Sequence, residues 1–321
     1  MDKNLKNIFR YIFWTAVAVV LVWFCVKAVN WNEFLGALKM CKWGYVAAAF
    51  AVGCIFIVVR GLRWHMLIKP IDPAIGKVDV INAYGIGFLA NLVLPRAGEV
   101  VKVGYVVKHS RHSWDAVIGS YLLEKGIDAV ILLCLTAVFL AGSWGKLSDV
   151  LQLGAGPMIW LAAGLAAAAL GFLTLCFALR EKGGIWAKCW NAVKGVGKGL
   201  GAIRELEKPG LFILYTASIW ASFWLTSALI IWALQDIEPF TVLTTADALN
   251  LTVTGSITTL VPVPGGFGAY HGAVATVMQV LYDIPLGSGM VYATLNHESQ
   301  VLAQAVVGLW CYVRETFLRK Q

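Results

Sequence analysis

The stretch Val80–Val107 reads VINAYGIGFLANLVLPRAGEVVKVGYVV and is mainly apolar, but Leu94-Pro95-Arg96-Ala97-Gly98 interrupts its middle. A second apolar stretch, Thr244–Tyr282, is interrupted in the same way at Pro262-Val263-Pro264-Gly265-Gly266. Proline removes a helix hydrogen-bond donor and glycine weakens a helix, so neither stretch should continue as one helix through its centre. We therefore predict that each forms two short helices around an irregular turn.

The rest of the chain has the composition of a membrane protein. Of its 321 residues, 59% are hydrophobic and 14% are charged, whereas a soluble domain has roughly a quarter of its residues charged. The mean hydropathy is +0.74. We predict an all-α polytopic membrane protein, a single transmembrane domain over residues 1–321 without a soluble catalytic domain. Besides the two broken stretches it has about six full spans, at Tyr11–Val29, Gly44–Val59, Ala116–Leu140, Met158–Leu179, Leu211–Leu234 and Gly289–Val313.

The net charge of +8 does not indicate nucleic-acid binding, because the basic residues lie between apolar segments. There they report orientation, since cytoplasmic loops of membrane proteins carry an excess of lysine and arginine. Basic clusters in Met1–Arg10, in Arg180–Lys208 and after Val313 predict cytoplasmic N- and C-termini in a bacterial-type inner membrane. The loop with Asp236 and Glu238 has no lysine or arginine and is predicted to face outward.

One loop conflicts with this orientation. If the first span crosses fully, the outward loop that follows it holds Lys27, Lys39 and Lys42. With the larger clusters fixing the termini, Val80–Val107 should dip into the bilayer from the cytoplasm and Thr244–Tyr282 from outside, as two opposed re-entrant hairpins. The two units, about 44–140 and 211–313, then form an inverted repeat, which is typical of alternating-access transporters.

Charged residues inside the span Ala116–Leu140 need an explanation. At a helix centre, each of Glu124, Lys125 and Asp128 costs about 2.5–3.5 kcal/mol unless it is paired or hydrated. Glu124 and Asp128 are four residues apart and share a helix face, so we predict that both face the protein interior, with Arg96 or Lys102 as partner. The alternative is a structural charge cluster near the cytoplasmic end of the span.

The last span carries a second polar cluster, made of Asn296, His297, Glu298, Gln300 and Gln304. Part of this cluster follows a helical stripe that must face protein or water. It occupies a place in the second unit that matches the place of the charged residues in the first. This correspondence favours a functional role for both clusters.

The first turn has the residues of an anion site: Asn91, Arg96, Glu99 and Lys102. Free amides at a helix N-terminus together with an arginine suit a phosphate group. Arg60 and Arg63, at helical spacing, could add to that site, or they could be ordinary interfacial anchors.

The second turn, Pro264-Gly265-Gly266, indicates conformational freedom and close backbone approach. His271 follows one helical turn later, although a lone histidine is more often a satisfied polar residue than a ligand. We predict no metal or other cofactor. In particular, His109 and His112 on a basic loop do not by themselves indicate a metal site.

Four ordered motifs resemble the flippase-like transmembrane region of lysylphosphatidylglycerol synthase, the multiple peptide resistance factor. They are Arg60-Gly-Leu-Arg63-Trp64, Asn91-Leu-Val-Leu-Pro95-Arg96-Ala-Gly98-Glu99, Glu124-Lys-Gly-Ile-Asp128 and Pro262-Val-Pro264-Gly265-Gly266-Phe-Gly268. The resemblance covers the chain from about residue 10 to its end. It implies movement of a lipid headgroup between leaflets, with aminoacylated phosphatidylglycerol as substrate in the best-known members. Other members are linked to polyprenyl-phosphate or glycolipid pathways.

The chain departs from that family in two respects. Fused members have a soluble aminoacyl-transferase domain, for which no residues remain after Val313, so we expect that this chain does not synthesise the lipid. The family also commonly has an acidic residue where this chain has His271 and an arginine where it has Lys125, which leaves the substrate's charge open.

The sequence therefore predicts a flippase-like transporter that moves a phospholipid or polyprenyl-phosphate headgroup, and not an enzyme. Arg96, with Arg60 or Arg63, would bind a phosphate; Glu99, Glu124 and Asp128 would bind cationic headgroup atoms or protons. Glu298 and His271 would form the opposite gate. The partner is a membrane lipid, and a homo-oligomer is compatible with the sequence. Two alternatives are open: a small-solute or ion-coupled transporter, and an intramembrane lipid-modifying enzyme, for which no HExxH or nucleophile-elbow motif is found.

Overall fold

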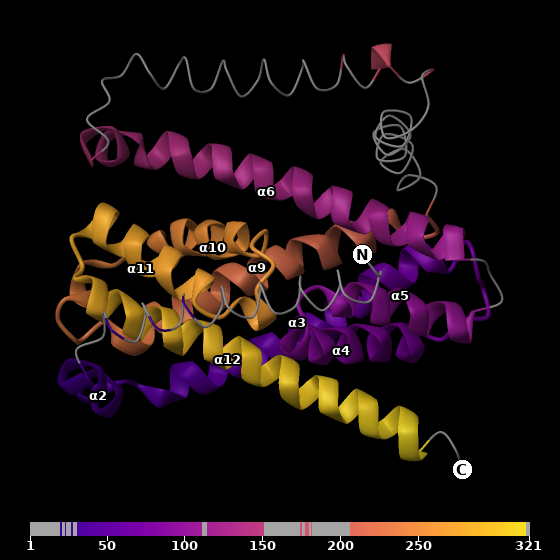
Figure 1. Ribbon diagram of the computed structural model, residues 1–321, viewed down its shortest axis with the longest axis horizontal. Helices are drawn as coiled ribbons and strands as arrows, with labels where there is room; N and C mark the ends of the chain where they lie inside the picture. The colour runs from indigo at the N-terminus through magenta and orange to yellow at the C-terminus, as the bar shows by residue number, and fades with distance from the viewer. Residues whose placement is uncertain are drawn as a thin grey trace, which may run out of the picture. The chain divides into compact units, whose positions relative to one another are not determined.

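The computed structural model describes residues 31–110, 114–150 and 206–318, together with single positions between 20 and 27 and between 174 and 181. All regular elements in these ranges are helices (Figure 1). The chain divides into two compact units, Met1–Val117 with Gly210–Gln321 and Ile118–Pro209, which are considered separately. The predicted spans Tyr11–Val29 and Met158–Leu179 fall almost wholly outside the described residues.

Three helices are long and apolar enough to cross a bilayer: α3 (Trp43–Ile68), α9 (Pro209–Leu234) and α6 (Trp114–Val150). Each of them contains one of the predicted spans, so the prediction of a multi-pass membrane protein is confirmed. The helices α3 and α9 each have 26 residues and are about 39 Å long, which exceeds the roughly 30 Å of a bilayer's hydrocarbon core. The last predicted span is the helix α12 (Leu286–Val313), whose middle carries polar residues.

Both broken stretches form two helices around a turn, as predicted from their proline and glycine residues. The first hairpin consists of α4 (Lys77–Val93) and α5 (Ala97–His109). The second consists of α10 (Asp247–Thr258) and α11 (Ala269–Tyr282), with the short helix η4 (Pro264–Gly266) in its turn. In Figure 1 the two hairpins occupy opposite ends of the first compact unit, α4 and α5 on the right and α10 and α11 on the left. Their depth in a bilayer stays a prediction.

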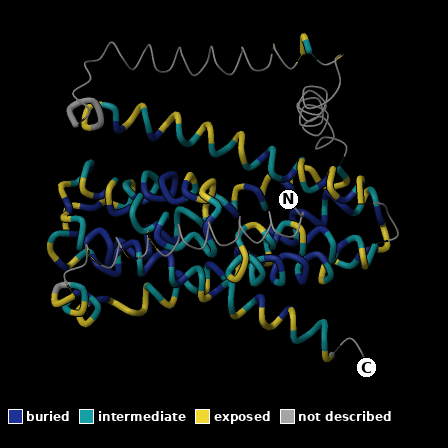
Figure 2. Tube along the Cα trace, viewed as in Figure 1, coloured by how far each residue is buried: buried dark blue, intermediate teal, exposed yellow. Residues whose placement is uncertain are grey.

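The helix α12 is the centre of this unit, because it packs against α3, α4 and α11. Figure 2 shows the buried residues concentrated between these helices. Glycines allow the closest approach: a Cβ atom added at Gly308 of α12 would lie 2.6 Å from the carbonyl oxygen of Gly85 in α4. Small residues at such crossings let helix backbones pack closely within a membrane, where van der Waals contact drives association.

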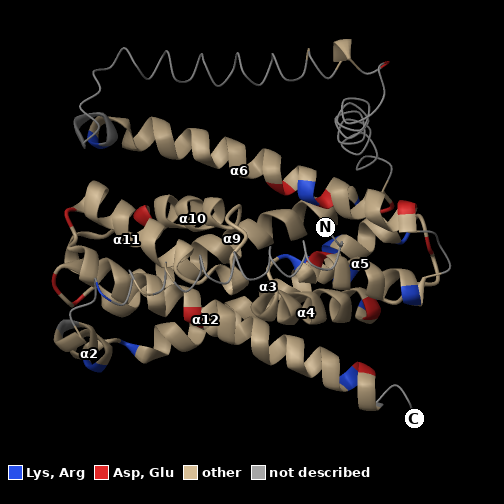
Figure 3. Cartoon of the chain, viewed as in Figure 1, with Lys and Arg blue, Asp and Glu red and all other residues tan. Residues whose placement is uncertain are grey.

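A contact near the start of α3 joins the lysine-containing loop of the orientation conflict to the acidic loop. The amide of Lys42 donates a hydrogen bond to the carbonyl of Ala233 at 3.0 Å, and the Lys42 ammonium pairs with Asp236. The lysine-containing loop and the acidic loop therefore lie at the same end of the bundle. Because the orientation rule counts lysine and arginine and gives acidic residues little weight, this ion pair does not remove the conflict. In Figure 3 most described charged residues of this unit gather toward the helix ends.

The glycine crossing between α4 and α12 predicts different effects on unfolding free energy for two glycine-to-alanine substitutions. In Gly308→Ala the new Cβ meets the backbone of α4, which cannot rotate away, and we expect a loss of about 1–3 kcal/mol in unfolding free energy. In Gly272→Ala, on α11, the new Cβ meets nothing within 4 Å, and we expect no loss or a gain of up to about 1 kcal/mol. Thermal unfolding of both purified variants in detergent is the measurement. Equal stability of the two variants would contradict the observed packing.

Candidate functional site

The first turn is closed by hydrogen bonds within its own hairpin. The Asn91 side chain, in the last turn of α4, accepts a hydrogen bond at its Oδ1 from the amide of Gly98 at 2.7 Å. The amide of Ala97 donates to the carbonyl of Leu94 at 3.1 Å. The expectation that amides at the start of α5 are free for an anion is therefore wrong for these two residues. Asn91 instead acts as a helix cap supplied by the preceding helix.

Arg96 connects the two hairpins. Its backbone has a φ of 59°, which is uncommon outside glycine and lets the chain turn directly into α5. Its side chain reaches the second hairpin, where Nη2 donates to the carbonyl oxygen of Leu260 at 2.9 Å. Leu260 lies just beyond the end of α10, so the turns of the two hairpins meet at this bond. A guanidinium has five N–H donors, and this bond uses one of them.

Two cationic residues predicted to belong to the site at the first turn, Arg60 and Lys102, are buried beside aromatic rings. Arg60 is 9% exposed and its Cζ lies 5.3 Å from the ring centre of Phe56, while Lys102 is 4% exposed. The Lys102 ammonium lies 4.0 Å from the ring centre of Tyr84 and 3.7 Å from the carboxylate of Glu99. Cations over aromatic faces are attracted by the ring quadrupole.

Burial of the arginine pair decides between its two interpretations. Arg63 is fully buried and Arg60 nearly so. An interfacial anchor keeps its charged head in water while its stem lies along apolar surface. The alternative of ordinary interfacial anchoring is therefore wrong for both arginines, and both belong to the interior beside α4 and α5.

The acidic pair of α6 belongs to the second compact unit. Glu124 is fully buried and Asp128, one helical turn later, is partly buried. Burial of Glu124 agrees with the prediction that it faces protein. The predicted contacts of this pair with Arg96 or Lys102 would cross between the two units and remain predictions.

The second turn meets the polar cluster of α12. Gly265 and Gly266 have φ values of 59° and 80°, in the left-handed region that favours glycine. The carbonyl oxygen of Gly265 accepts a hydrogen bond from His297 Nε2 at 2.9 Å. The second turn therefore contacts α12 through the His297 side chain.

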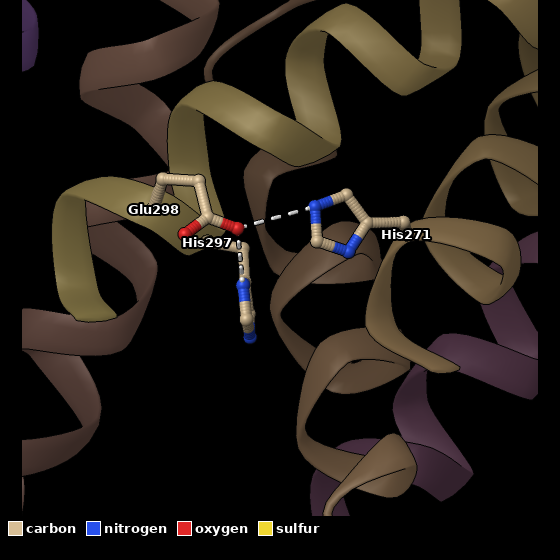
Figure 4. A group of neighbouring side chains, drawn as sticks. All are labelled: His271, His297 and Glu298. Atoms are coloured by element: carbon tan, nitrogen blue, oxygen red, sulfur yellow. Dashed lines mark hydrogen bonds and ion pairs between the residues drawn. The ribbon is translucent and has the colours of Figure 1, made fainter. Parts of the chain in front are cut away.

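Three side chains converge beside this turn (Figure 4). His297 Nδ1 lies 3.0 Å from the Oε1 atom of Glu298, and His271 Nε2 lies 3.5 Å from the same oxygen. The sequence named His271 and Glu298 as site residues, and the structure brings them together. His297 was assigned only to the polar stripe, and its position next to Glu298 in that stripe was the available signal.

A buried polar network holds α9, α11 and α12 together behind this cluster. The Asn296 side-chain amide donates to the hydroxyl oxygens of Tyr270 at 2.8 Å and Ser227 at 3.2 Å. The hydroxyl of Tyr292 donates to the carbonyl of Ser227 at 3.1 Å. Buried polar groups are costly unless they are hydrogen-bonded, so this network fixes how the three helices pack. The sequence pointed to Asn296 but not to its partners, which come from distant apolar segments.

The family model described as the lysylphosphatidylglycerol synthase TM region matches residues 11–308 of the chain. No curated protein and no solved structure matches the chain.

The cap on α5 is tested by two substitutions of Asn91. In Asn91→Leu the amide of the buried Gly98 loses its acceptor, and we expect a loss of about 1–3 kcal/mol in unfolding free energy. In Asn91→Asp a carboxylate oxygen keeps that role at a helix N-terminus, so stability should stay near that of the unmodified protein. Denaturant or thermal unfolding in detergent compares the two. A Leu variant as stable as the Asp variant would show that the cap contributes nothing.

Proposed function

Because the chain belongs to the lysylphosphatidylglycerol synthase transmembrane-region family, we propose that it is a transporter that moves a phosphate-bearing membrane lipid between leaflets. The observation that carries the proposal is the bond between Arg96 and the Leu260 carbonyl. It joins the turns of two broken helical hairpins that come from opposite ends of one bundle. Broken helices that meet at a central point are the substrate sites of many transporters that work by alternating access.

The Arg96 bond is suited to act as a gate. A neutral carbonyl is a weaker acceptor for a guanidinium than a phosphate, because hydrogen bonds between two charged groups are roughly twice as strong. A lipid phosphate that reaches the turn would therefore displace Leu260 from Arg96. Loss of that bond separates the two turns and opens the path between them. In this scheme the substrate itself weakens the contact that blocks its passage.

The buried cations beside the first turn extend the path toward the other end of the first hairpin. Lys102 lies one helical turn after Glu99, and Arg60 and Arg63 lie on the neighbouring helix α3. Their positive charges would attract a phosphate into a region of low dielectric. The carboxylate of Glu99 would bind cationic headgroup atoms or protons, a role that the sequence also gives to Glu124 and Asp128. A zwitterionic headgroup needs both kinds of charge.

The proposal includes the membrane arrangement expected from the sequence. Both hairpins would be re-entrant, with their turns at bilayer depth and both chain termini in the cytoplasm of a bacterial-type inner membrane. Backbone that is not helical is tolerated at that depth only where protein or a water-filled cavity surrounds it. The hydrogen bonds at both turns support such a position, because they satisfy backbone groups that lipid could not.

Leaflet exchange in liposomes tests the proposal, with a matched pair of lysine variants on α5. Lys102→Gln removes a buried charge. We expect the exchange rate of a labelled phosphatidylglycerol to fall at least about tenfold, which corresponds to the loss of one hydrogen bond to a charged group. Lys108→Gln makes the same change at an exposed position and should leave the rate unchanged. Equal rates in the two variants would contradict a role for the buried cation. Uptake of a solute, or a new lipid product, without exchange would favour the alternatives.

Arg96→Lys tests the phosphate role of the gate. Lysine keeps the charge but lacks the planar fork that forms paired hydrogen bonds to a phosphate, so we expect exchange to slow by about tenfold or more. The same substitution at Arg314, at the end of α12, is the control and should not change the rate. Size-exclusion profiles establish that both variants are folded. Near-normal exchange in Arg96→Lys would remove Arg96 from the phosphate site.

A further inference from the structure

The cluster of His271, His297 and Glu298 has a geometry that the transport scheme does not use. His271 comes from the first turn of α11, and the other two residues come from the middle of α12. One nitrogen of each imidazole and one carboxylate oxygen lie within 4.8 Å of one another. Each imidazole side chain is 11% exposed, whereas the Glu298 side chain is 40% exposed. The cluster is therefore more enclosed on its histidine side than beside the carboxylate.

The protonation of His297 follows from its backbone contact. The carbonyl oxygen of Gly265 can only accept a hydrogen bond, so His297 Nε2 must carry the proton. In the neutral imidazole the other nitrogen, Nδ1, then presents a lone pair. This lone pair faces the Glu298 oxygen at 3.0 Å. Two acceptors at this distance attract each other only when a cation lies between them.

We propose that this cation is a divalent transition-metal ion of the zinc type, bound by His271 Nε2, His297 Nδ1 and a Glu298 carboxylate oxygen. Zinc bonds of 2.0–2.2 Å in tetrahedral geometry place neighbouring ligand atoms about 3.3 Å apart. The two distances to Glu298, 3.0 Å and 3.5 Å, lie on either side of that value. The third pair, one nitrogen of each imidazole, lies within 4.8 Å.

The ligand types select the ion. Imidazole nitrogens with one carboxylate suit zinc, cobalt, nickel or copper, while calcium and magnesium require mostly oxygen ligands. Two histidines and a glutamate also leave a fourth position open, as in zinc sites that bind a water molecule or a substrate. The exposed side of Glu298 gives that position access to solvent or to an anionic group.

The surrounding contacts orient His297 better than His271. His297 donates from Nε2 to a backbone carbonyl, which is the usual way in which a metal-binding histidine is oriented. His271 Nδ1 is buried and has no hydrogen-bond partner. Since such outer contacts contribute about 10–100-fold in affinity, we expect weaker binding than in a site where both histidines are held. Metal would join α11 to α12 beside the second turn and so stabilise the observed packing.

The experiment uses the full chain, purified in detergent with its affinity tag removed and treated with chelator. Cobalt chloride is titrated while the visible ligand-field absorption of Co²⁺ is recorded, and zinc chloride is then added to displace it. We expect one Co²⁺ per chain, loss of the absorption on addition of zinc, and a higher unfolding temperature with zinc. Glu298→Gln, the mildest change at the most exposed ligand, should weaken binding at least about 100-fold, because it removes a direct ligand. His271→Asn should do the same.

His109→Asn is the matched control. His109 also pairs with a glutamate, Glu315, at 3.0 Å, but no third metal-binding side chain joins that pair among the described residues. This variant should bind Co²⁺ like the unmodified chain. Absence of saturable binding in the unmodified protein would overturn the proposal and leave a proton as the cation in the cluster. Binding that survives Glu298→Gln and His271→Asn would also overturn it, because the metal would then lie elsewhere.

Discussion

A helix that breaks inside an apolar bundle exposes backbone N–H and C=O groups that lipid cannot satisfy, and this constraint organises the described part of the protein. Three of these groups, at or beside the two turns, receive a side-chain partner. Asn91 accepts from the amide of Gly98, Arg96 donates to the carbonyl of Leu260, and His297 donates to the carbonyl of Gly265. The first role of these polar side chains is therefore to satisfy backbone hydrogen-bonding groups.

The positions of the breaks could be predicted from the sequence, but most of the partners could not. Proline and glycine act locally, so Leu94-Pro95-Arg96 and Pro264-Gly265-Gly266 are recognisable without any knowledge of the fold. Arg96 and Leu260 are 164 residues apart, and only the packing of the two hairpins brings them together. The same holds for His271 and His297, whose side chains meet because α11 and α12 are adjacent. Sequence reasoning accordingly found one of these histidines as a site residue and did not indicate a metal site.

Burial of the charged residues was the second feature that local pattern could not decide. Arg60 and Arg63 follow an apolar segment, which fits an interfacial anchor equally well from sequence alone. The structure buries both, and it places Lys102 against the rings of Tyr84 and Trp64. Aromatic partners from α3 and α4 make this burial tolerable, since a cation near a ring face recovers part of its lost hydration. Tyrosine and tryptophan in these helices were visible in the sequence, but their direction toward the lysine was not.

The two turns differ in what closes them, and this difference has a mechanical consequence. The hydrogen bond between the two turns comes from one exposed arginine side chain, whereas the second turn is also held by His297 of α12, next to the buried Asn296 network. A long side chain with several rotatable bonds can release its partner without moving a helix, whereas the shorter, buried His297 side chain has less freedom to leave Gly265. The Arg96 side chain is therefore the contact between the turns that can be released at low energetic cost, since the first hairpin itself is packed against α12 through α4. The turn of the second hairpin, held by His297 of α12, is the surface against which this side chain closes.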